Sequence, residues 1–260
     1  MGGSRLKVTA IVPARDEEQN IADCLESLDW ADERVVFLDS RTVDRTAELA
    51  QEAGARVLQH TFENFSQFHN AALDRVEAEW VLFVDGDERC TPELAEEIRA
   101  VTAGDRDGRD DREVLWWVPR HNYIFGRLTL GGGWYPDYQP RLLLQGRTRW
   151  ERPVHEIVIA DGPKGKLKHP LIHYNYIDLP DFISRQRGYT DFAAQRLLQE
   201  GVRPRLYTPY SQAVRHFWWR FVTLEGKQDG FHGLWLSVLT AYYEVVTYRK
   251  LARLRKKAGL

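Results

Sequence analysis

Short apolar runs and helix-like patterns alternate through the first hundred residues of the chain. The runs are rich in branched and aromatic side chains, as strands are, and they lie at residues 6–13, 34–39, 55–60 and 80–85. Between them, apolar residues recur at spacings of three and four, which is typical of helices that pack by one face. Strands that alternate with helices predict an α/β domain whose parallel strands are joined by right-handed crossovers.

The segments between the predicted strands carry helix signals of their own. Apolar side chains share a helical face in residues 21–28, 47–50 and 65–76. A fourth helix is expected to begin after Thr91, because threonine is a good N-cap and Pro92 suits the first helical turn. These helices place the carboxyl ends of all the parallel strands at one edge of the sheet, where α/β proteins bind their ligands.

The pattern changes after residues 104–113, a charged stretch that we expect to form an exposed loop. Residues 114–120 predict one more strand, and between residues 131 and 160 strands alternate with glycine-rich turns. From Leu179 onward the sequence is helical and strongly aromatic. We therefore expect an α/β domain over residues 1–178 and a helical region over residues 179–260.

Composition and charge are those of a soluble globular protein. Apolar residues make up 43% and charged residues 28% of the 260 residues, and the net charge of −2 gives no reason to expect nucleic acid as a partner. Two cysteines, Cys24 and Cys90, are too few for a disulfide framework, which favours a reducing cytoplasm. We expect neither a signal peptide nor a transmembrane helix, because no apolar stretch is long enough.

An acidic cluster follows the last of the four predicted strands. In "VLFVDGDERC" (81–90), the apolar run leads directly into Asp85, Asp87 and Glu88, which repel one another unless a positive group lies among them. An Asp-x-Asp pair also occurs in ordinary turns. At the carboxyl edge of a parallel sheet, however, two such carboxylates suit Mg²⁺ or Mn²⁺ with a substrate diphosphate. Polar residues at 13–17 and 39–44 reach the same edge.

Six segments, in order, match one known family of enzymes. The chain resembles the family 2 glycosyltransferases, which have the GT-A fold, and is most similar to the branch that includes lipopolysaccharide core β-1,4-glucosyltransferases. The resemblance implies a mostly parallel, Rossmann-like sheet with helices on both faces, and it covers nearly the whole chain. The matching segments are "VPARDEEQNI" (12–21), "FLDSRTVDRT" (37–46), "FSQFHNAAL" (65–73), "FVDGDE" (83–88), "GGWYPDYQPRL" (132–142) and "RPVHEIV" (152–158).

The resemblance implies a nucleotide-sugar site at the first two strands. Pro13, Arg15 and Glu17 match the loop beneath the nucleoside, and Asp39 matches the residue that recognises uracil or ribose. The family often has Asp-Ser-Gly-Ser-x-Asp at this point, whereas this chain has arginine at position 41. Arg41 is therefore a candidate contact to the donor or the acceptor, and the identity of the donor sugar stays open.

The resemblance also implies a metal site that uses the acidic cluster. Asp85 and Asp87 match the pair that holds Mg²⁺ or Mn²⁺ on the donor diphosphate, and His155 is a candidate third ligand. The family commonly has a cationic residue where this chain has His69. We expect His69 either to neutralise phosphate when protonated or to pack as a helix residue against the sheet.

Sugar transfer with inversion requires a base that accepts the proton of the acceptor hydroxyl. Glu156 is the first candidate for this base and Asp137 is the second. Asp137 could instead bind the hydroxyls of the acceptor. Trp134 and Tyr135 offer flat faces for a sugar ring, although such residues also serve in cores. Arg141 is expected near the acceptor or as an ion-pair partner of Asp137.

These features together predict a metal-dependent inverting glycosyltransferase. We expect it to move a hexose, with glucose favoured, from a UDP-sugar to a hydroxyl of a lipid-linked saccharide, such as the inner core of lipopolysaccharide. One alternative is a polyprenyl-phosphate glycosyltransferase, whose ionised acceptor needs no base. The other is a non-catalytic protein that binds nucleotide sugars or membranes, against which the intact acidic residues speak.

The aromatic C-terminal region contains a helix of unusual pattern. In residues 234–250, a narrow polar stripe on an otherwise apolar helix comprises Ser237, Thr240, Glu244 and Thr247. Six cations without an acidic residue follow in residues 249–257, and "RHFWWRF" (215–221) places two tryptophans between arginines. The pattern predicts a peripheral protein on the inner face of the cell membrane, held by anionic lipid, or else a helix in a homo-oligomer interface.

Overall fold

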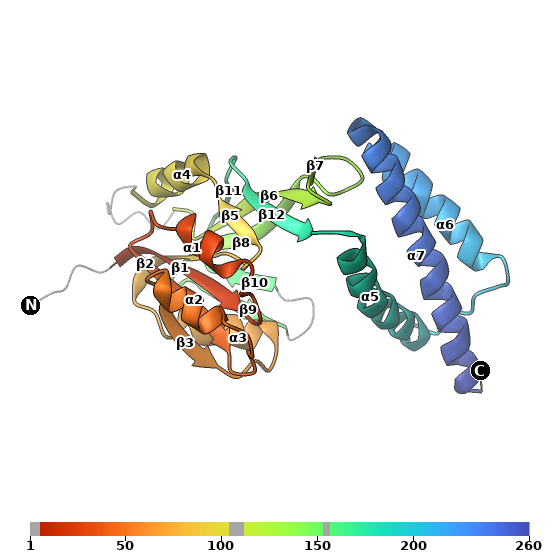
Figure 1. Cartoon of the computed structure of the whole chain (residues 1–260), viewed down its shortest axis with the longest axis horizontal. Coiled ribbons are helices and arrows are strands. Elements are labelled where there is room, and N and C mark those ends of the chain that lie inside the picture. Colours follow the sequence, from red (N-terminus) through yellow and green to blue (C-terminus); the bar gives the residue numbers. More distant parts are fainter. Residues whose placement is uncertain (1–5, 104–111, 153–156, 260) are drawn as a thin grey trace, which may run out of the picture. The chain divides into compact units, whose positions relative to one another are not determined.

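The computed structural model describes residues 6–103, 112–152 and 157–259, and its elements are labelled in Figure 1. The chain divides into two compact units, which we call the sheet unit and the helical unit. The sheet unit comprises Met1–Arg120 and Tyr138–His173, and the helical unit comprises His121–Asp137 and Tyr174–Leu260. The division expected at residue 178 therefore differs in one important respect, because residues 121–137 belong with the C-terminal helices.

Four parallel strands form the first half of the sheet, as the sequence predicts. In spatial order they are β3 (Arg56–His60), β2 (Glu33–Asp39), β1 (Leu6–Ala14) and β4 (Ala78–Phe83). The central strand β1 pairs in parallel with both β2 and β4. Strand β4 begins and ends two residues before the predicted run, so Asp85 lies in the turn after the strand and not within it.

The second half of the sheet contains antiparallel pairs. Strand β8 is antiparallel to β4, and the order continues through β6, β12 and β5, with β7 and β11 on β6. A separate antiparallel ribbon consists of β9 and β10. The bounds are β5 Glu88–Cys90, β6 Leu115–Ile124, β7 Arg127–Thr129, β8 Asp137–Leu144, β9 Thr148–Glu151, β10 Ile157–Ala160, β11 Lys164–Lys166 and β12 Leu171–Tyr176.

Helices cover both faces of the sheet. Alternate side chains of a strand point to opposite faces, so Trp80 and Leu82 of β4 join one apolar cluster while Val81 and Phe83 join the other. The first cluster includes residues of α1 (Ile21–Glu26), α2 (Thr46–Glu52) and α4 (Pro92–Ala103), and the second includes residues of α3 (Phe65–Leu73) and of the β9–β10 ribbon. The sheet unit therefore has the layered α/β architecture that the alternating pattern predicts.

The predicted cap of α4 is confirmed. The hydroxyl of Thr91 accepts a hydrogen bond from the backbone N–H of Leu94 at 3.2 Å, which satisfies one of the free donors at the start of the helix. Pro92 occupies the first helical position, where a missing N–H costs nothing. The cap fixes the point at which β5 turns into α4, directly after the acidic cluster.

The helical unit is built around long helices. These are α5 (Leu179–Gln199), α6 (Thr208–Trp218) and α7 (Gly230–Lys257), with the π-helix η1 (Trp219–Thr223) and the 3₁₀ helix η2 (Gly226–Asp229) between α6 and α7. Their buried cluster includes Phe182 and Leu236. Among the helices within the described residues, none is both long enough and apolar enough to cross a bilayer.

Backbone contacts explain why residues 121–137 join the helices. The carboxylate of Asp229 accepts hydrogen bonds from the backbone N–H groups of Leu130 and Gly131, at 3.1 and 2.7 Å. A Cβ atom at Gly131 would lie 2.4 Å from the carbonyl oxygen of Glu225, so only glycine allows this approach. The guanidinium of Arg220 donates to the carbonyl oxygen of Gly132 at 2.6 Å. The glycine-rich segment thus fits closely against the turn before α7.

Candidate active site

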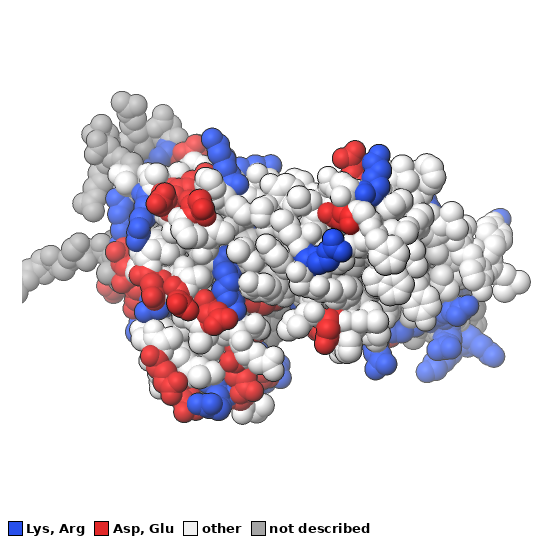
Figure 2. Space-filling view, turned by 45° about the horizontal axis from the view of Figure 1, so that its top comes forward, with Lys and Arg blue, Asp and Glu red and all other residues white. Residues whose placement is uncertain are grey.

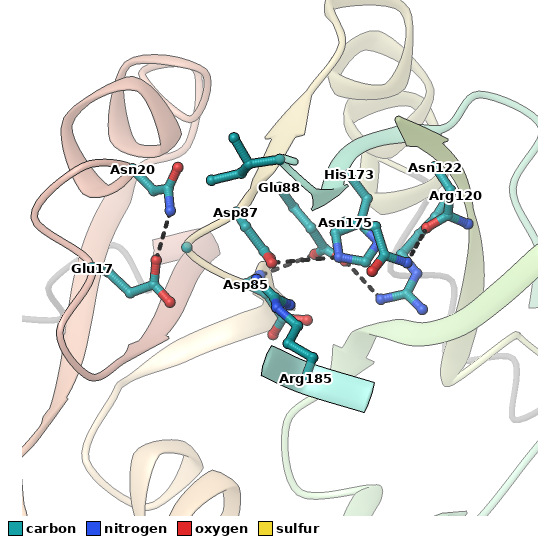
Figure 3. A network of polar contacts seen from close by, with 12 residues as sticks. Glu17, Asn20, Asp85, Asp87, Glu88, Arg120, Asn122, His173, Asn175 and Arg185 are labelled. Atoms are coloured by element: carbon teal, nitrogen blue, oxygen red, sulfur yellow. Dashed lines mark hydrogen bonds and ion pairs between the residues drawn. The ribbon is translucent and has the colours of Figure 1, made fainter. Parts of the chain in front are cut away.

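The carboxyl ends of β1, β2 and β4 meet at one edge of the sheet unit, as the parallel arrangement requires. Arg15 and Glu17 follow β1, and Asp39 is the last residue of β2. Asp85 and Asp87 lie in the turn between β4 and β5. Figure 3 shows the loop with Glu17 beside this acidic turn. The structure therefore brings together the donor and metal candidates of the first hundred residues.

The positive group among the three carboxylates is Arg141. Its Nη1 donates to Oδ1 of Asp85 at 3.1 Å and its Nη2 to Oδ2 of the same carboxylate, which makes a two-pronged contact. The same Nη2 donates to Oε1 of Glu88 at 2.6 Å. Glu88 is completely buried, and Arg120 adds a second guanidinium at 3.3 Å. Arg141 and Arg120 thus hold the acidic turn in place through their contacts with its carboxylates.

The pKa values of Asp85 and Glu88 are shifted in opposite directions. Partial burial by itself raises the pKa of Asp85, but the charge of Arg141 and its hydrogen bonds outweigh this and hold the pKa well below the ordinary value. Complete burial raises the pKa of Glu88 above its ordinary value, although the charge of Arg141 opposes this rise. Asp85 is consequently the carboxylate that stays ionised at the mouth of the sheet.

Arg141 does not have the position that the sequence led us to expect. We expected it near the acceptor or paired with Asp137, whereas its buried guanidinium lies on Asp85 and Glu88. The reason is the antiparallel pairing of β8 with β4, which places Leu142 opposite Leu82 and so brings the start of β8 alongside the acidic turn. Arg141 is therefore the counter-ion of Asp85 and Glu88.

Asp87 is placed next to a residue that the sequence analysis missed. The Nε2 of His173 lies 3.5 Å from Oδ2 of Asp87 (Figure 3). His173 belongs to β12, which pairs with β5 so that His173 stands opposite Glu88. The signal in the sequence was the alternation of "LIHYNY" (171–176), which puts this histidine on the same strand face as the buried Leu171.

The acidic pair fits a divalent cation that completes its shell elsewhere. The side chains of Asp85 and Asp87 are 41% and 20% exposed, so each is partly accessible from solvent. Within the part of the chain that the structure describes, no group of three or more His, Cys, Asp or Glu side chains could hold a metal by itself. Two carboxylates with diphosphate oxygens are a common arrangement for Mg²⁺. His155 and Glu156 lie outside the described residues.

The loop after β1 packs directly against the acidic turn. A Cβ atom at Gly86 would lie 3.0 Å from Cγ of Glu17, so the glycine between the two aspartates lets the Glu17 side chain lie flat on the turn. The Nδ2 of Asn20 donates to Oε2 of Glu17 at 2.9 Å, and the backbone N–H of Glu17 donates to Oγ1 of Thr46 at 2.7 Å. Glu17 is therefore a fixed part of the acidic cluster.

Asp39 carries its own arginine. Arg41 donates to the buried Asp39 carboxylate through Nη2 at 2.6 Å and through Nε at 3.1 Å, and its guanidinium lies 5.6 Å from the centre of the Phe62 ring. The hydrogen bond from Arg41 holds the pKa of Asp39 below its ordinary value, against the opposing effect of burial. The Nη1 of Arg15 lies 4.0 Å from Oδ2 of Asp39. In the parallel pairing of β1 with β2, Pro13 lies opposite Phe37.

His69 is packed between α3 and the sheet. Its Nδ1 bonds to the carbonyl oxygen of Phe65 at 2.8 Å, and its ring stacks on Trp150 with 4.5 Å between ring centres. The ring also meets the edge of Phe83 at 4.9 Å. This is the packing role expected as one of two alternatives. The contact with Phe83, two residues before Asp85, nevertheless places the His69 ring near the acidic turn.

The remaining acceptor candidates belong to the helical unit. Asp137 accepts a hydrogen bond from Nδ2 of Asn122 at 3.2 Å. Trp134 lies beneath the guanidinium of Arg220, 5.0 Å from the ring centre, and packs against the cluster of the helical unit. Tyr135 is 37% exposed, so of the two aromatic candidates it offers the more accessible face.

The Arg141 cluster predicts a specific loss of stability. Arg141→Met should lower the free energy of unfolding by about 3–5 kcal/mol at pH 7.5, because it leaves Glu88 buried with only one cation. The loss of stability should be smaller near pH 5. Glu88 has a raised pKa, so it takes up a proton there in the folded state and no longer needs a counter-ion. In the wild type, the low pKa of Asp85 adds stability above pH about 4 that disappears as the pH falls through the folded pKa.

Chemical denaturation at the two pH values measures these changes. The matched control is Arg149→Met, which removes an arginine paired with Asp74 where both side chains are more than half exposed. This control should change the free energy of unfolding by less than about 1 kcal/mol. An equal loss in both variants, or an Arg141→Met loss that is the same at pH 7.5 and pH 5, would contradict the counter-ion role.

Several proteins similar to this chain are named as glycosyltransferases. A lipopolysaccharide core biosynthesis glycosyltransferase, LpsC of Rhizobium meliloti, is 26% identical over 94% of this chain and 88% of its own length. An uncharacterized glycosyltransferase of Rickettsia felis is also 26% identical, over 96% of this chain and 90% of its own length. The similarity to both proteins includes the sheet unit and the helical unit.

Solved structures show weaker similarity. TarS of S. aureus matches with a TM-score of 0.43 and 16% identity, over 94% of this chain and 82% of that chain. Glucosyl-3-phosphoglycerate synthase of Mycobacterium tuberculosis, solved with Mn²⁺, UDP and glucosyl-3-phosphoglycerate, matches with a TM-score of 0.45 and 16% identity, over 76% and 81% of the two chains.

The family model gives the most direct assignment. The model of glycosyl transferase family 2 matches residues 9–153, which is more than half of the chain. This range includes the loop after β1, the end of β2 with Asp39 and the acidic turn. Because the matched range covers more than half of the chain and includes the acidic turn at the carboxyl edge, the chain belongs to glycosyl transferase family 2.

Proposed function

We propose that this glycosyltransferase moves a hexose, with glucose favoured, from a UDP-sugar to a hydroxyl of a lipid-linked saccharide, with inversion at the transferred carbon. The observation that carries the proposal is the convergence of Asp39, Asp85 and Asp87 at one edge of the parallel sheet. An acidic pair suits a cation on a diphosphate, and a buried carboxylate two strands away suits the hydrogen-bond donors of a nucleoside.

Donor recognition is proposed to use the loop after β1 and the end of β2. Asp39 would accept hydrogen bonds from uracil or ribose, with Pro13, Arg15 and Glu17 forming the surface beneath the nucleoside. Arg41 binds the buried Asp39 carboxylate with a half-exposed guanidinium, and hydrogen bonds from uracil or ribose to Asp39 would replace this contact and free Arg41 to turn outward. We therefore propose that Arg41 moves onto the donor when the nucleotide binds, because a phosphate is the stronger partner for an exposed guanidinium.

The metal is proposed to be Mg²⁺ or Mn²⁺. Asp85, Asp87 and His155 would hold it, and when bound it would stabilise the negative charge that develops on the leaving UDP. Arg141 contributes by keeping Asp85 ionised and by fixing its carboxylate with two hydrogen bonds. His173 would orient Asp87 in the same way, through its contact at 3.5 Å.

The acceptor hydroxyl needs a base, and we propose Glu156 for this role with Asp137 as the second candidate. Tyr135 and Trp134 remain candidates for contact with the acceptor sugar, and the exposed ring of Tyr135 is the better placed of the two. The acceptor is proposed from the relative named for lipopolysaccharide core biosynthesis. A saccharide of this kind is anchored in lipid, so the enzyme would work on the inner face of an anionic membrane.

Turnover of a panel of UDP-sugars, with Mn²⁺ and a purified lipid-linked core saccharide, tests the proposal. We expect release of UDP that depends on the acceptor, with UDP-glucose among the donors used, and NMR of the product should show inverted anomeric configuration. Retained configuration would contradict the mechanism. Transfer to polyprenyl phosphate alone would favour the alternative in which no base is required, and absence of turnover with every UDP-sugar would favour a binding protein.

A further inference from the structure

Helix α7 is arranged with its polar stripe inward. Ser237 and Thr247 are buried, and their hydroxyls donate to carbonyl oxygens one turn earlier in the same helix, at 2.7 and 2.9 Å. Glu244 of the same stripe lies 3.6 Å from His216 of α6. The polar stripe expected from the sequence therefore packs within the helical unit, and part of the apolar surface of α7 is left facing outward.

The outward side of α7 is apolar and aromatic over its first half. Exposed side chains recur there at spacings of three and four, which places them on one line along the helix. Phe231, the first of them, is 79% exposed. A monomeric protein rarely leaves a continuous aromatic line in water, because each such ring gains about 1.5–3 kcal/mol when it is buried. The line consists of Phe231, Trp235, Val238 and Tyr242.

Helix α6 presents a second line of the same kind. Its exposed apolar residues also follow spacings of three and four, and Trp218 at its end is 62% exposed. The Nη2 of Arg249 on α7 donates to the hydroxyl of Tyr210 on α6 at 3.2 Å. This contact shows that the outward line of α6 adjoins the outward side of α7. The line on α6 consists of Tyr207, Tyr210, Val214 and Trp218.

The second half of the outward line on α7 is basic. Arg249, Arg253 and Lys256 continue the spacing after Tyr242, and all three are exposed. Figure 2 shows Lys and Arg gathered at one end of the helical unit. Lys250 of the same helix is used internally instead, since it pairs with Asp191 of α5 at 2.7 Å. Along the outward line from Phe231 to Lys256 there is no acidic residue, because Glu244 is on the opposite side of the helix.

We propose that these two lines form a docking face for the surface of an anionic lipid bilayer. The aromatic rings of α6 and α7 enter the boundary between headgroups and acyl chains, and Arg249, Arg253 and Lys256 bind the anionic headgroups. Aromatic side chains prefer this depth, and each cation near an anionic leaflet contributes roughly 1 kcal/mol. The docking face comprises Tyr207, Tyr210, Val214, Trp218, Phe231, Trp235, Val238, Tyr242, Arg249, Arg253 and Lys256.

A second copy of the chain is the less suitable occupant. Two copies that met through this face would bring together aromatic residues and cations, but neither copy would offer a carboxylate of the face to pair with the cations of the other. A bilayer with anionic headgroups satisfies both parts of the face. The inference rests on the proposed function in one respect only, namely that a lipid-linked acceptor makes docking useful to the enzyme.

Co-sedimentation with vesicles tests the docking face directly. The wild-type protein should sediment with vesicles of phosphatidylcholine and phosphatidylglycerol at low salt, and far less with phosphatidylcholine alone or at high salt. The variant with Arg249→Gln, Arg253→Gln and Lys256→Gln should lose about a hundredfold in partition coefficient, as expected for three cations. The variant with Phe231→Ser and Trp235→Ser should lose at least about tenfold.

The matched control removes the same charge from the sheet unit. Lys164→Gln, Lys166→Gln and Lys168→Gln change three exposed lysines there, and this variant should sediment like the wild type. UDP binding by each variant shows that it is folded and that its donor site is intact. Vesicle binding can therefore be interpreted even if the protein transfers no sugar. Equal sedimentation of the two triple variants would overturn the proposal. The proposal would also be overturned if the wild-type protein did not bind vesicles and formed a dimer that Trp235→Ser dissociates.

Discussion

Asp87→Ala should weaken the binding of UDP by about a hundredfold in the presence of Mn²⁺, and removal of the metal with EDTA should weaken wild-type binding to a similar degree. The reason is the position of the two aspartates in the acidic turn. The carboxylates of Asp85 and Asp87 are partly exposed, whereas Arg141 contacts Asp85 and Glu88 with a buried guanidinium. A diphosphate that approaches without a divalent cation therefore meets two carboxylates of like charge.

Isothermal calorimetry with UDP, with and without metal, measures this effect. The control is Asp74→Ala, which removes an exposed aspartate paired with Arg149 in the same unit and should leave UDP binding unchanged. Asp87→Asn adds a second comparison, because it keeps the shape of the side chain while removing its charge. The same affinity for UDP with Mn²⁺ and with EDTA would show that the acidic turn does not hold a metal for the donor.

The fold of the sheet unit could be predicted because its signals are local. The apolar runs and the three- and four-residue spacings locate β1 to β4 and α1 to α4, and the start of α4 is marked by Thr91. Once these elements are parallel, geometry alone brings Asp39 and the acidic turn to one edge. The positions of the donor candidates therefore followed from the sequence without knowledge of any long-range pairing.

The partners of the site residues could not be predicted in the same way. Arg141 reaches Asp85 because β8 pairs with β4, and the two residues are 56 positions apart. His173 reaches Asp87 because β12 pairs with β5. Strand order among the later elements depends on side-chain packing across the sheet, and the periodicity of a single strand does not reveal its neighbour.

Two further features depended on packing between helices. The stripe of Ser237 and Thr247 identified a special side of α7, but only the contact of Glu244 with His216 shows that this side faces α6. The segment from residue 121 to residue 137 was placed with the α/β domain because it lies between strands. Its backbone bonds to Asp229 place it with the helices instead.

The largest expected effect on catalysis belongs to the base. Glu156→Gln should lower kcat by about a hundredfold or more, because the glutamine cannot accept the proton of the acceptor hydroxyl. Binding of UDP should change little, since this carboxylate is proposed to act on the acceptor and not on the donor. Glu156 lies outside the described residues, so the expectation rests on its place in "RPVHEIV" (152–158).

Asp137→Asn is the matched comparison, because it makes the same chemical change at the second candidate. Asp137 accepts a hydrogen bond from Asn122 at 3.2 Å, and an amide at this position can still accept that bond. If Glu156 is the base, kcat should fall by less than about tenfold in Asp137→Asn, and any larger effect should appear in KM for the acceptor. Single-turnover rates with saturating UDP-sugar and acceptor separate chemistry from binding. Near-wild-type rates in Glu156→Gln, with a hundredfold loss in Asp137→Asn, would assign the base to Asp137. Near-wild-type rates in both would favour an acceptor that is already ionised, such as a polyprenyl phosphate.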